Sequence, residues 1–112
     1  MSVDDYYLKV AGVTFKNPDG SDRQLIIRNL NAGDRLYFIA EPNNPYDSNA
    51  VRIETKAGQQ IGFVPRAYNS QIFDNLIHHR GEYTLTVSAV TGGGFDTNYG
   101  LNFKVHFEPR GT

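Results

Sequence analysis

Short runs of alternating apolar and polar residues recur along most of this chain, and turn residues separate them. Alternation with a period of two places every second side chain on the same face of a strand. We therefore expect strands over residues 6–15, 35–41, 50–54, 60–64, 83–90 and 99–108, with a weaker candidate over 24–27. Residues 66–80 instead predict the one main helix, because Ile72, Phe73 and Leu76 recur at helical spacing. Gly81 is expected to end that helix.

About six short strands with one main helix are typical of a small β-barrel, since sandwiches of this size usually lack such a helix. The predicted fold class is thus mainly β: a small OB-like barrel with one α-helix at about 66–80. The 112 residues suffice for one core but not two, so we expect one domain over 1–112 with its core at about 6–108. The run 36–39 is expected to be covered on both faces, and residues 108–112 to form a frayed tail.

Composition restricts the chemistry available to this chain. It has no cysteine, which excludes disulfides and thiol catalysis, and its three histidines do not form a convincing metal set. The net charge is −1, so any contact with nucleic acid should be local and should neutralise few phosphates. We find no signal peptide, membrane span, catalytic triad or phosphate-binding loop. We therefore expect a cytoplasmic protein that is not an enzyme and needs no cofactor or metal.

The connection between the strands at 35–41 and 50–54 has the most distinctive chemistry. It contains two prolines and three asparagines, and it places Tyr46 directly beside Asp47. A stiff loop that presents a ring and a carboxylate together is suited to stacking a flat group and binding a neighbouring hydroxyl. The alternative is a well-built hairpin connection in which the aspartate and asparagines cap their own backbone.

Three motifs resemble one known family, the HIRAN domains. They are Gly-Val-Thr-Phe at 12–15, Asn-Asn-Pro-Tyr-Asp-Ser-Asn-Ala-Val at 43–51, and Gly-x-x-Ile-Gly-Phe-Val-Pro-Arg at 58–66. The resemblance covers about residues 6 to 108. It implies an OB-like module that captures single-stranded DNA at a free 3′ end.

The resemblance also implies roles for individual residues. Tyr46 would stack on the terminal base, and Asp47 would accept a hydrogen bond from the 3′-hydroxyl. Phe15 and Tyr99 would supply further aromatic contacts, and Arg66 would contact a phosphate. Each of the last three also has a structural alternative: packing in the core for Phe15, packing against the glycine loop at 92–94 for Tyr99, and pairing with a surface carboxylate for Arg66.

Asn44 belongs to the same predicted interface, as do two positions that depart from the family pattern. Thr14 stands where a DNA-binding member has an arginine, and Phe63 stands where it has a histidine. Both departures remove donors to phosphate, so the stacking part of the site is retained while its electrostatic part is reduced.

The resulting hypothesis is a module for single-stranded DNA ends that acts in DNA repair, replication, or phage or bacterial DNA processing. A helicase or nuclease acting in trans is a candidate partner, and no membrane is involved. The alternative is a protein- or peptide-interaction module that keeps the fold without binding DNA. Such a module would recognise its partner by a groove or a sheet edge.

Overall fold

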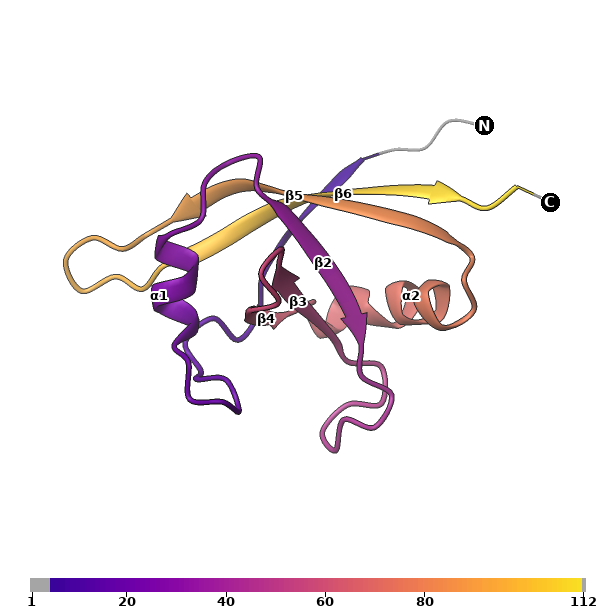
Figure 1. Cartoon of the computed structure of the whole chain (residues 1–112), viewed down its shortest axis with the longest axis horizontal. Helices are drawn as coiled ribbons and strands as arrows, with labels where there is room; N and C mark the ends of the chain where they lie inside the picture. The colour runs from indigo at the N-terminus through magenta and orange to yellow at the C-terminus, as the bar shows by residue number, and fades with distance from the viewer. Residues whose placement is uncertain (1–4, 112) are drawn as a thin grey trace.

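A computed structural model describes residues 5–111 as a curled, mostly β structure (Figure 1). Six strands and two helices lie within those residues. In chain order they are β1 (Tyr6–Lys9), α1 (Arg23–Arg28), β2 (Arg35–Ala40), β3 (Val51–Thr55), β4 (Gln60–Phe63), α2 (Arg66–Ile77), β5 (Gly81–Thr91) and β6 (Gly100–Pro109). The strands form one antiparallel sheet in the order β1-β6-β5-β2-β3-β4, curled into a half-barrel. The predicted mainly β, barrel-like fold is confirmed.

The sheet curls until the chain that leaves one edge meets the other edge. Ala11, just beyond β1, donates its N–H to the carbonyl of Phe63 in β4 at 2.8 Å, and the Phe63 N–H donates to the Ala11 carbonyl at 2.9 Å. Gly62 permits this approach, because a Cβ there would overlap the Ala11 carbonyl oxygen. Its φ of +152° also favours glycine. The closure holds the segment after β1 beside β4.

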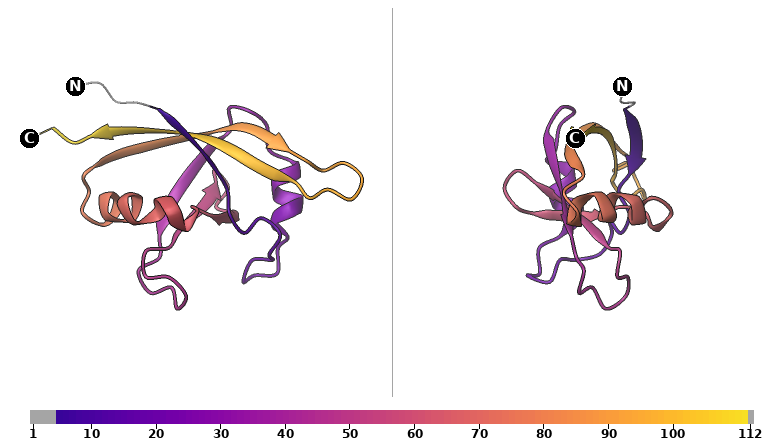
Figure 2. Two further views of the ribbon diagram at one scale, coloured as in Figure 1. Left: turned by 180° about the vertical axis from the view of Figure 1, so that it is seen from behind. Right: turned by 90° about the vertical axis from the view of Figure 1, so that its right-hand side faces the viewer.

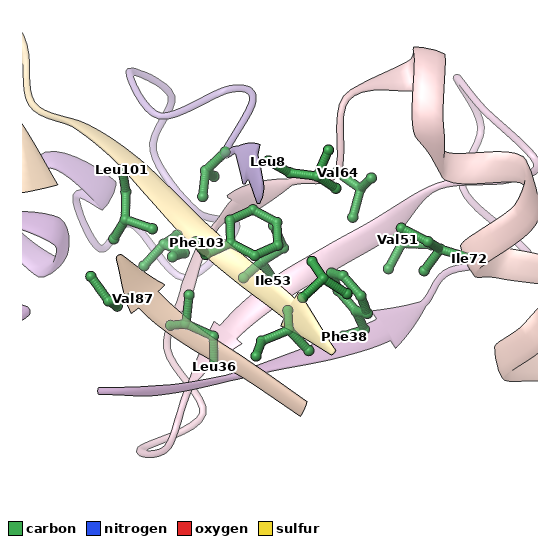
Figure 3. Packing of buried hydrophobic residues seen from close by; sticks show 14 of the residues in the cluster. Leu8, Leu36, Phe38, Val51, Ile53, Val64, Ile72, Val87, Leu101 and Phe103 are labelled. Carbon is green, nitrogen blue, oxygen red and sulfur yellow. The ribbon is translucent and has the colours of Figure 1, made fainter. Parts of the chain in front are cut away.

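A single apolar core fills the inside of the curled sheet (Figure 3). Leu101, Phe103 and Val105 alternate along β6 and are fully buried. Ile27 of α1 and Ile72 of α2 join the same core, so both helices are anchored to the sheet. Burial of each such side chain contributes about 1.5–3 kcal/mol to folding.

Two connecting segments, residues 10–22 and residues 41–50, project from the same side of the sheet. Both hang below it in Figure 1, and the view from behind in Figure 2 shows the same arrangement. The loop that joins β5 to β6 extends from a different end of the molecule. The curl of the sheet therefore brings together two segments that are about 30 residues apart in sequence.

The strand predicted at 24–27 is wrong, because these residues lie in α1. The Asp22 side chain caps this helix by accepting a hydrogen bond from the Gln24 N–H at 2.9 Å. Arg23, Ile26 and Ile27 are all buried, and their i, i+3, i+4 spacing places them on one helical face. Two adjacent buried isoleucines fit a helix, since neighbours in a strand point to opposite faces.

The predicted limits of the main helix also need correction at the C-terminal end. Helix α2 ends at Ile77 rather than at residue 80, and His79 adopts the left-handed conformation with φ +50°. Gly81 does not end the helix but begins β5. A Cβ on Gly81 would overlap the carbonyl oxygen of Glu108 in β6, so this glycine allows the two strands to approach closely.

Three further expectations are wrong in detail. β1 ends at Lys9, so the chain from residue 12 to Phe15 forms a turn instead of continuing the strand. Tyr37 leaves one face of β2 partly exposed, so that strand is not covered on both sides. β6 continues to Pro109, and the Arg110 N–H donates to the carbonyl of Arg80 at 2.8 Å, so the tail is paired through residue 110.

Candidate nucleic-acid interface

The two projecting segments enclose a cleft of about 580 Å³ with α2 and β4. Six of the eight residues predicted for the interface line it: Phe15, Asn44, Tyr46, Asp47, Phe63 and Arg66. The fold thus brings three sequence motifs to one place.

The cleft has two walls of different construction. The loop wall consists of residues 44–47 together with Arg66 and Asn69 of α2. The strand wall consists of residues 11, 12 and 15, Arg23 of α1, and Gln60 and Phe63 of β4. The sequence motifs account for all of the loop wall except Asn69, whereas Arg23 and Gln60 were not predicted.

Asn44 organises the turn of the loop wall. Its Oδ1 accepts hydrogen bonds from the N–H groups of Tyr46 at 2.8 Å and Asp47 at 3.1 Å. Its Nδ2 donates to Oε1 of Glu41 at 2.9 Å. The loop therefore does cap its own backbone, as the alternative interpretation expected. This capping fixes the backbone from which the Tyr46 and Asp47 side chains project.

Asp47 is held by donors on both carboxylate oxygens. Oδ1 accepts from the Asn49 N–H at 2.9 Å, and Oδ2 accepts from Nδ2 of Asn69 at 2.8 Å. Nε of Arg66 lies 3.5 Å from Oδ2. The hydrogen bond from Asn49 is the main cause that lowers the pKa of Asp47, and Asn69 and Arg66 lower it further. Asp47 is therefore an ionised acceptor at neutral pH.

Tyr46 and Arg66 are both exposed on the loop wall. The Tyr46 side chain is 86% exposed, so a core role for this ring is excluded. Arg66, the first residue of α2, donates from Nη2 to the Tyr46 carbonyl at 2.8 Å. Its ion pair with Asp47 confirms that Arg66 pairs with a carboxylate, although that carboxylate belongs to the cleft.

The strand wall presents a second exposed ring opposite this loop. Phe15 is 65% exposed, so it is not a core residue. Phe63 is partly buried, and the guanidinium carbon of Arg23 lies 5.5 Å from the centre of its ring. A cation over an aromatic face is favourable and orders both groups.

Arg23 is a buried cation in the strand wall, with only 6% of the residue exposed. Its Nε donates to Oδ1 of Asn17 at 2.7 Å, and its Nη1 donates to the carbonyl of Gly12 at 2.8 Å. Burial lowers the pKa of Arg23, and the charge of Glu41 partly opposes that change. Arginine nonetheless stays charged at neutral pH. The sequence does carry a signal for this helix: Asp22 is a favourable N-cap, and the apolar Ile26 and Ile27 lie three and four residues after Arg23.

The remaining two predicted residues, Thr14 and Tyr99, do not line the cleft. Thr14 is exposed beside Phe15. Tyr99 packs closely against Gly93, where a Cβ would overlap its ring, and its backbone is held by Gln24. The alternative interpretation, packing of Tyr99 against the glycine loop, describes its contacts.

A match to a family model shows to which known proteins this chain is related. Residues 3–108 match the model of the HIRAN domain. The chain belongs to the HIRAN domain family. HIRAN domains are known as DNA-binding modules.

Two solved structures share the fold of this HIRAN domain. The HIRAN domain of human HLTF superposes with a TM-score of 0.70 at 16% identity, covering 92% of this chain and 74% of that chain. A protein from Lactobacillus plantarum superposes with a TM-score of 0.63 at 17% identity, covering 92% of this chain and 99% of the other. Comparison with curated protein sequences gave no match.

The site of this HIRAN domain combines exposed rings, the carboxylates of Asp47 and Glu41, and two guanidinium groups. Within residues 5–111, no set of three or more histidine, aspartate or glutamate side chains is placed to hold a metal ion. In the same range no helix is long and apolar enough to cross a membrane. The chemistry that the cleft offers is therefore stacking, hydrogen-bond acceptance and attraction of negative charge.

Proposed function

We propose that this HIRAN domain binds single-stranded DNA at a free 3′-hydroxyl end, with the terminal nucleotide in the cleft. Tyr46 and Phe15 are assigned to base stacking, and Asp47 is assigned to accept the hydrogen bond of the 3′-hydroxyl. The observation that carries the proposal is the fixed pairing of an exposed ring with an ionised acceptor in one cleft.

The physical chemistry of each group supports its assigned role. Stacking of a base on an aromatic ring is worth about 1–3 kcal/mol and tolerates any base, because every base has a π face. A carboxylate accepts a hydrogen bond from a hydroxyl but repels a terminal phosphate of like charge. The cleft therefore suits an end that carries a hydroxyl better than one that carries a phosphate.

The proposal assigns a binding role, exercised in DNA repair, replication, or phage or bacterial DNA processing beside a helicase or nuclease. Both oxygens of Asp47 already accept hydrogen bonds from protein donors. These hydrogen bonds fix the orientation of the carboxylate and favour its ionised form. Tyr99 stays a prediction as an additional stacking ring outside the cleft, and Thr14 stays a prediction as a neighbouring contact.

The proposal is tested with a fluorescent single-stranded ten-mer that ends in either a 3′-hydroxyl or a 3′-phosphate, with binding followed by anisotropy at low salt. The expected result is tighter binding of the hydroxyl end, and loss of that preference in Asp47→Ala. Tyr68→Ala is the control and is expected to keep the preference, since Tyr68 is an exposed ring of α2 that does not line the cleft. Equal binding of both ends by the unchanged protein would contradict end recognition.

A second candidate function, capture of a peptide, is favoured by the apolar residues of the cleft. Pro18, Pro45 and Val64 line it together with the aromatic residues Phe15, Tyr46 and Phe63. Clefts with aromatic linings also suit extended, proline-rich peptides. Absence of binding to either ten-mer would favour this candidate over DNA binding.

A further inference from the structure

We propose that Arg23 is the principal phosphate-binding residue of the cleft and contacts a phosphodiester group close to the 3′ end. The inference rests on the proposed function, because it names the charge contact made by the same strand. It assigns to a buried residue of α1 the role that Thr14 and Phe63 are unable to fill.

The guanidinium of Arg23 is held in place but only partly used. Nε and Nη1 are bound to Asn17 and to the Gly12 carbonyl, and these two bonds fix the orientation of the planar group. Among residues 5–111, no acceptor is bound to Nη2, and Arg23 is one of the residues that line the cleft. A donor that is oriented in advance loses little conformational entropy when it binds.

The charge of Arg23 is also unpaired within the part of the chain that the structure describes. No carboxylate there forms an ion pair with it. Glu41, which lines the same cleft, directs its two oxygens to Asn44 and to Arg52. Glu41 offsets the charge of Arg23 without forming an ion pair with it, so an anion that binds the guanidinium relieves an existing cost.

A second unused donor lies in the same wall. Nε2 of Gln60 is buried without an acceptor in residues 5–111, and Gln60 is one of the residues that line the cleft. Asn17 joins the two residues, because its Oδ1 accepts from Arg23 and its Nδ2 donates to the Gln60 carbonyl at 2.8 Å. The strand wall is thus rich in donors, which suits a ligand rich in acceptors.

The surroundings of Arg23 favour a nucleotide phosphate over an isolated anion. Phe63 lies against its guanidinium, and the exposed rings of Phe15 and Tyr46 line the same cleft. A nucleotide carries a flat base and a phosphate on one sugar, so a single residue of the strand satisfies both kinds of group. Phosphate oxygens also match the fork geometry of arginine.

The test removes the charge from the DNA rather than from the protein. Three ten-mers are prepared, each with one uncharged methylphosphonate at one of the three linkages nearest the 3′-hydroxyl, and compared with the unmodified strand. With the unchanged protein, one of these strands is expected to bind about ten- to a hundredfold more weakly, the range for a hydrogen bond to a charged group. In Arg23→Gln that penalty is expected to fall below about twofold, because the contact is already missing.

Arg28→Gln is the matched control, since Arg28 is exposed on the same helix and does not line the cleft. It is expected to keep the full penalty. Because Arg23 also binds Asn17 and Gly12, its variant is first checked for folding. If it does not fold, the NMR signal of the Arg23 Nε–H is followed in the unchanged protein. That signal is expected to shift with the unmodified strand and not with the sensitive methylphosphonate strand.

The inference alone would be overturned by no penalty at any of the three linkages while the unmodified strand still binds, or by an equal penalty in Arg23→Gln and the unchanged protein. An Nε–H signal that does not respond to the unmodified strand would also overturn it. Failure of the unchanged protein to bind the unmodified strand at all would overturn both the inference and the proposed function.

Discussion

The two walls of the cleft are built in different ways. In the loop wall, Asn44 positions Tyr46 and Asp47, which are two and three residues away in sequence. In the strand wall, Arg23 and Phe63 are 40 residues apart and meet only because the sheet closes on itself. A wall made by local contacts is specified by a short motif, whereas a wall made by closure depends on the whole fold. Removal of the exposed ring of the first wall should affect binding alone, and changes to the closure that forms the second wall should affect stability as well.

The largest effect is expected from Gly62→Ala in β4, at the closure that holds the strand wall together. The new Cβ would overlap the Ala11 carbonyl and lie 2.6 Å from Cγ1 of Val10, and the backbone would be strained at a φ of +152°. We expect a loss of about 3 kcal/mol in the free energy of unfolding, measured by urea denaturation.

Gly58→Ala separates strain from overlap in this experiment. Gly58 has a φ of +80°, but nothing lies within 4 Å of the position of its Cβ. We expect a loss of about 1 kcal/mol there, from backbone strain alone. Similar losses in the two variants would mean that the contact between Ala11 and β4 does not hold the strand wall.

The next largest effect is expected from Tyr46→Ala in the loop wall, and it concerns binding alone. Removal of a stacking ring should weaken binding of the ten-mer by about ten- to a hundredfold. Stability should change by less than about 0.5 kcal/mol, because the side chain is exposed. Anisotropy and urea denaturation measure the two quantities, with Tyr68→Ala as the control. A large loss of stability would show that the ring supports the fold.

A smaller effect is expected from Asp47→Asn, and it should depend on pH. Hydrogen bonds hold the pKa of Asp47 in the folded protein below its value in the unfolded chain. The ionised carboxylate therefore stabilises the fold fully above the unfolded pKa of about 4, and this contribution is lost as the pH falls through the folded pKa. We expect the variant to be less stable by about 1 kcal/mol at pH 7 and by much less near pH 3.

Urea denaturation at the two pH values measures this difference. Asp96→Asn removes the same charge from the loop between β5 and β6, outside the cleft lining, and serves as the control. An Asp47→Asn difference that stays constant from pH 7 to pH 3 would contradict the special stabilisation of the Asp47 carboxylate.

The smallest effect is expected from Arg66→Gln. Arg66 is largely exposed, and exposed ion pairs contribute little, so binding of the ten-mer should weaken by only about threefold. The plot of log affinity against log salt should become shallower by about 0.7, the value for one phosphate contact on a single strand. A larger loss than that of Arg23→Gln would reverse the ranking of the two walls as sources of charge.

The sequence predicted the local parts of this molecule better than the parts that depend on closure. The loop motif placed Tyr46 and Asp47 together, and both line the cleft, because their positions are set by neighbours within a few residues. Arg23 was missed because its helix is only six residues long and the residues at 24–27 also fit a short strand. A charged residue is also not expected inside a fold. Its burial follows from α1 packing against the closed sheet, which short-range periodicity does not report.

The helix end at Ile77 was missed for a related reason. Gly81 gave a strong local signal for a helix stop, yet His79 takes the left-handed conformation instead. The glycine is required where β5 meets β6, a contact between residues 27 positions apart. Glycine is common both at helix ends and where two strands approach closely. At Gly81 the contact with β6 accounts for the glycine.

The most direct test of the two-walled cleft is an NMR titration of the ¹⁵N-labelled protein with the unmodified 3′-hydroxyl ten-mer. Amide signals are expected to shift in both walls, including those of Tyr46, Asp47 and Gly12, while that of Phe95 in the distant β5–β6 loop stays unchanged. Shifts confined to the Phe95 loop, or the absence of any shift at Gly12 and Tyr46, would contradict the two-walled cleft.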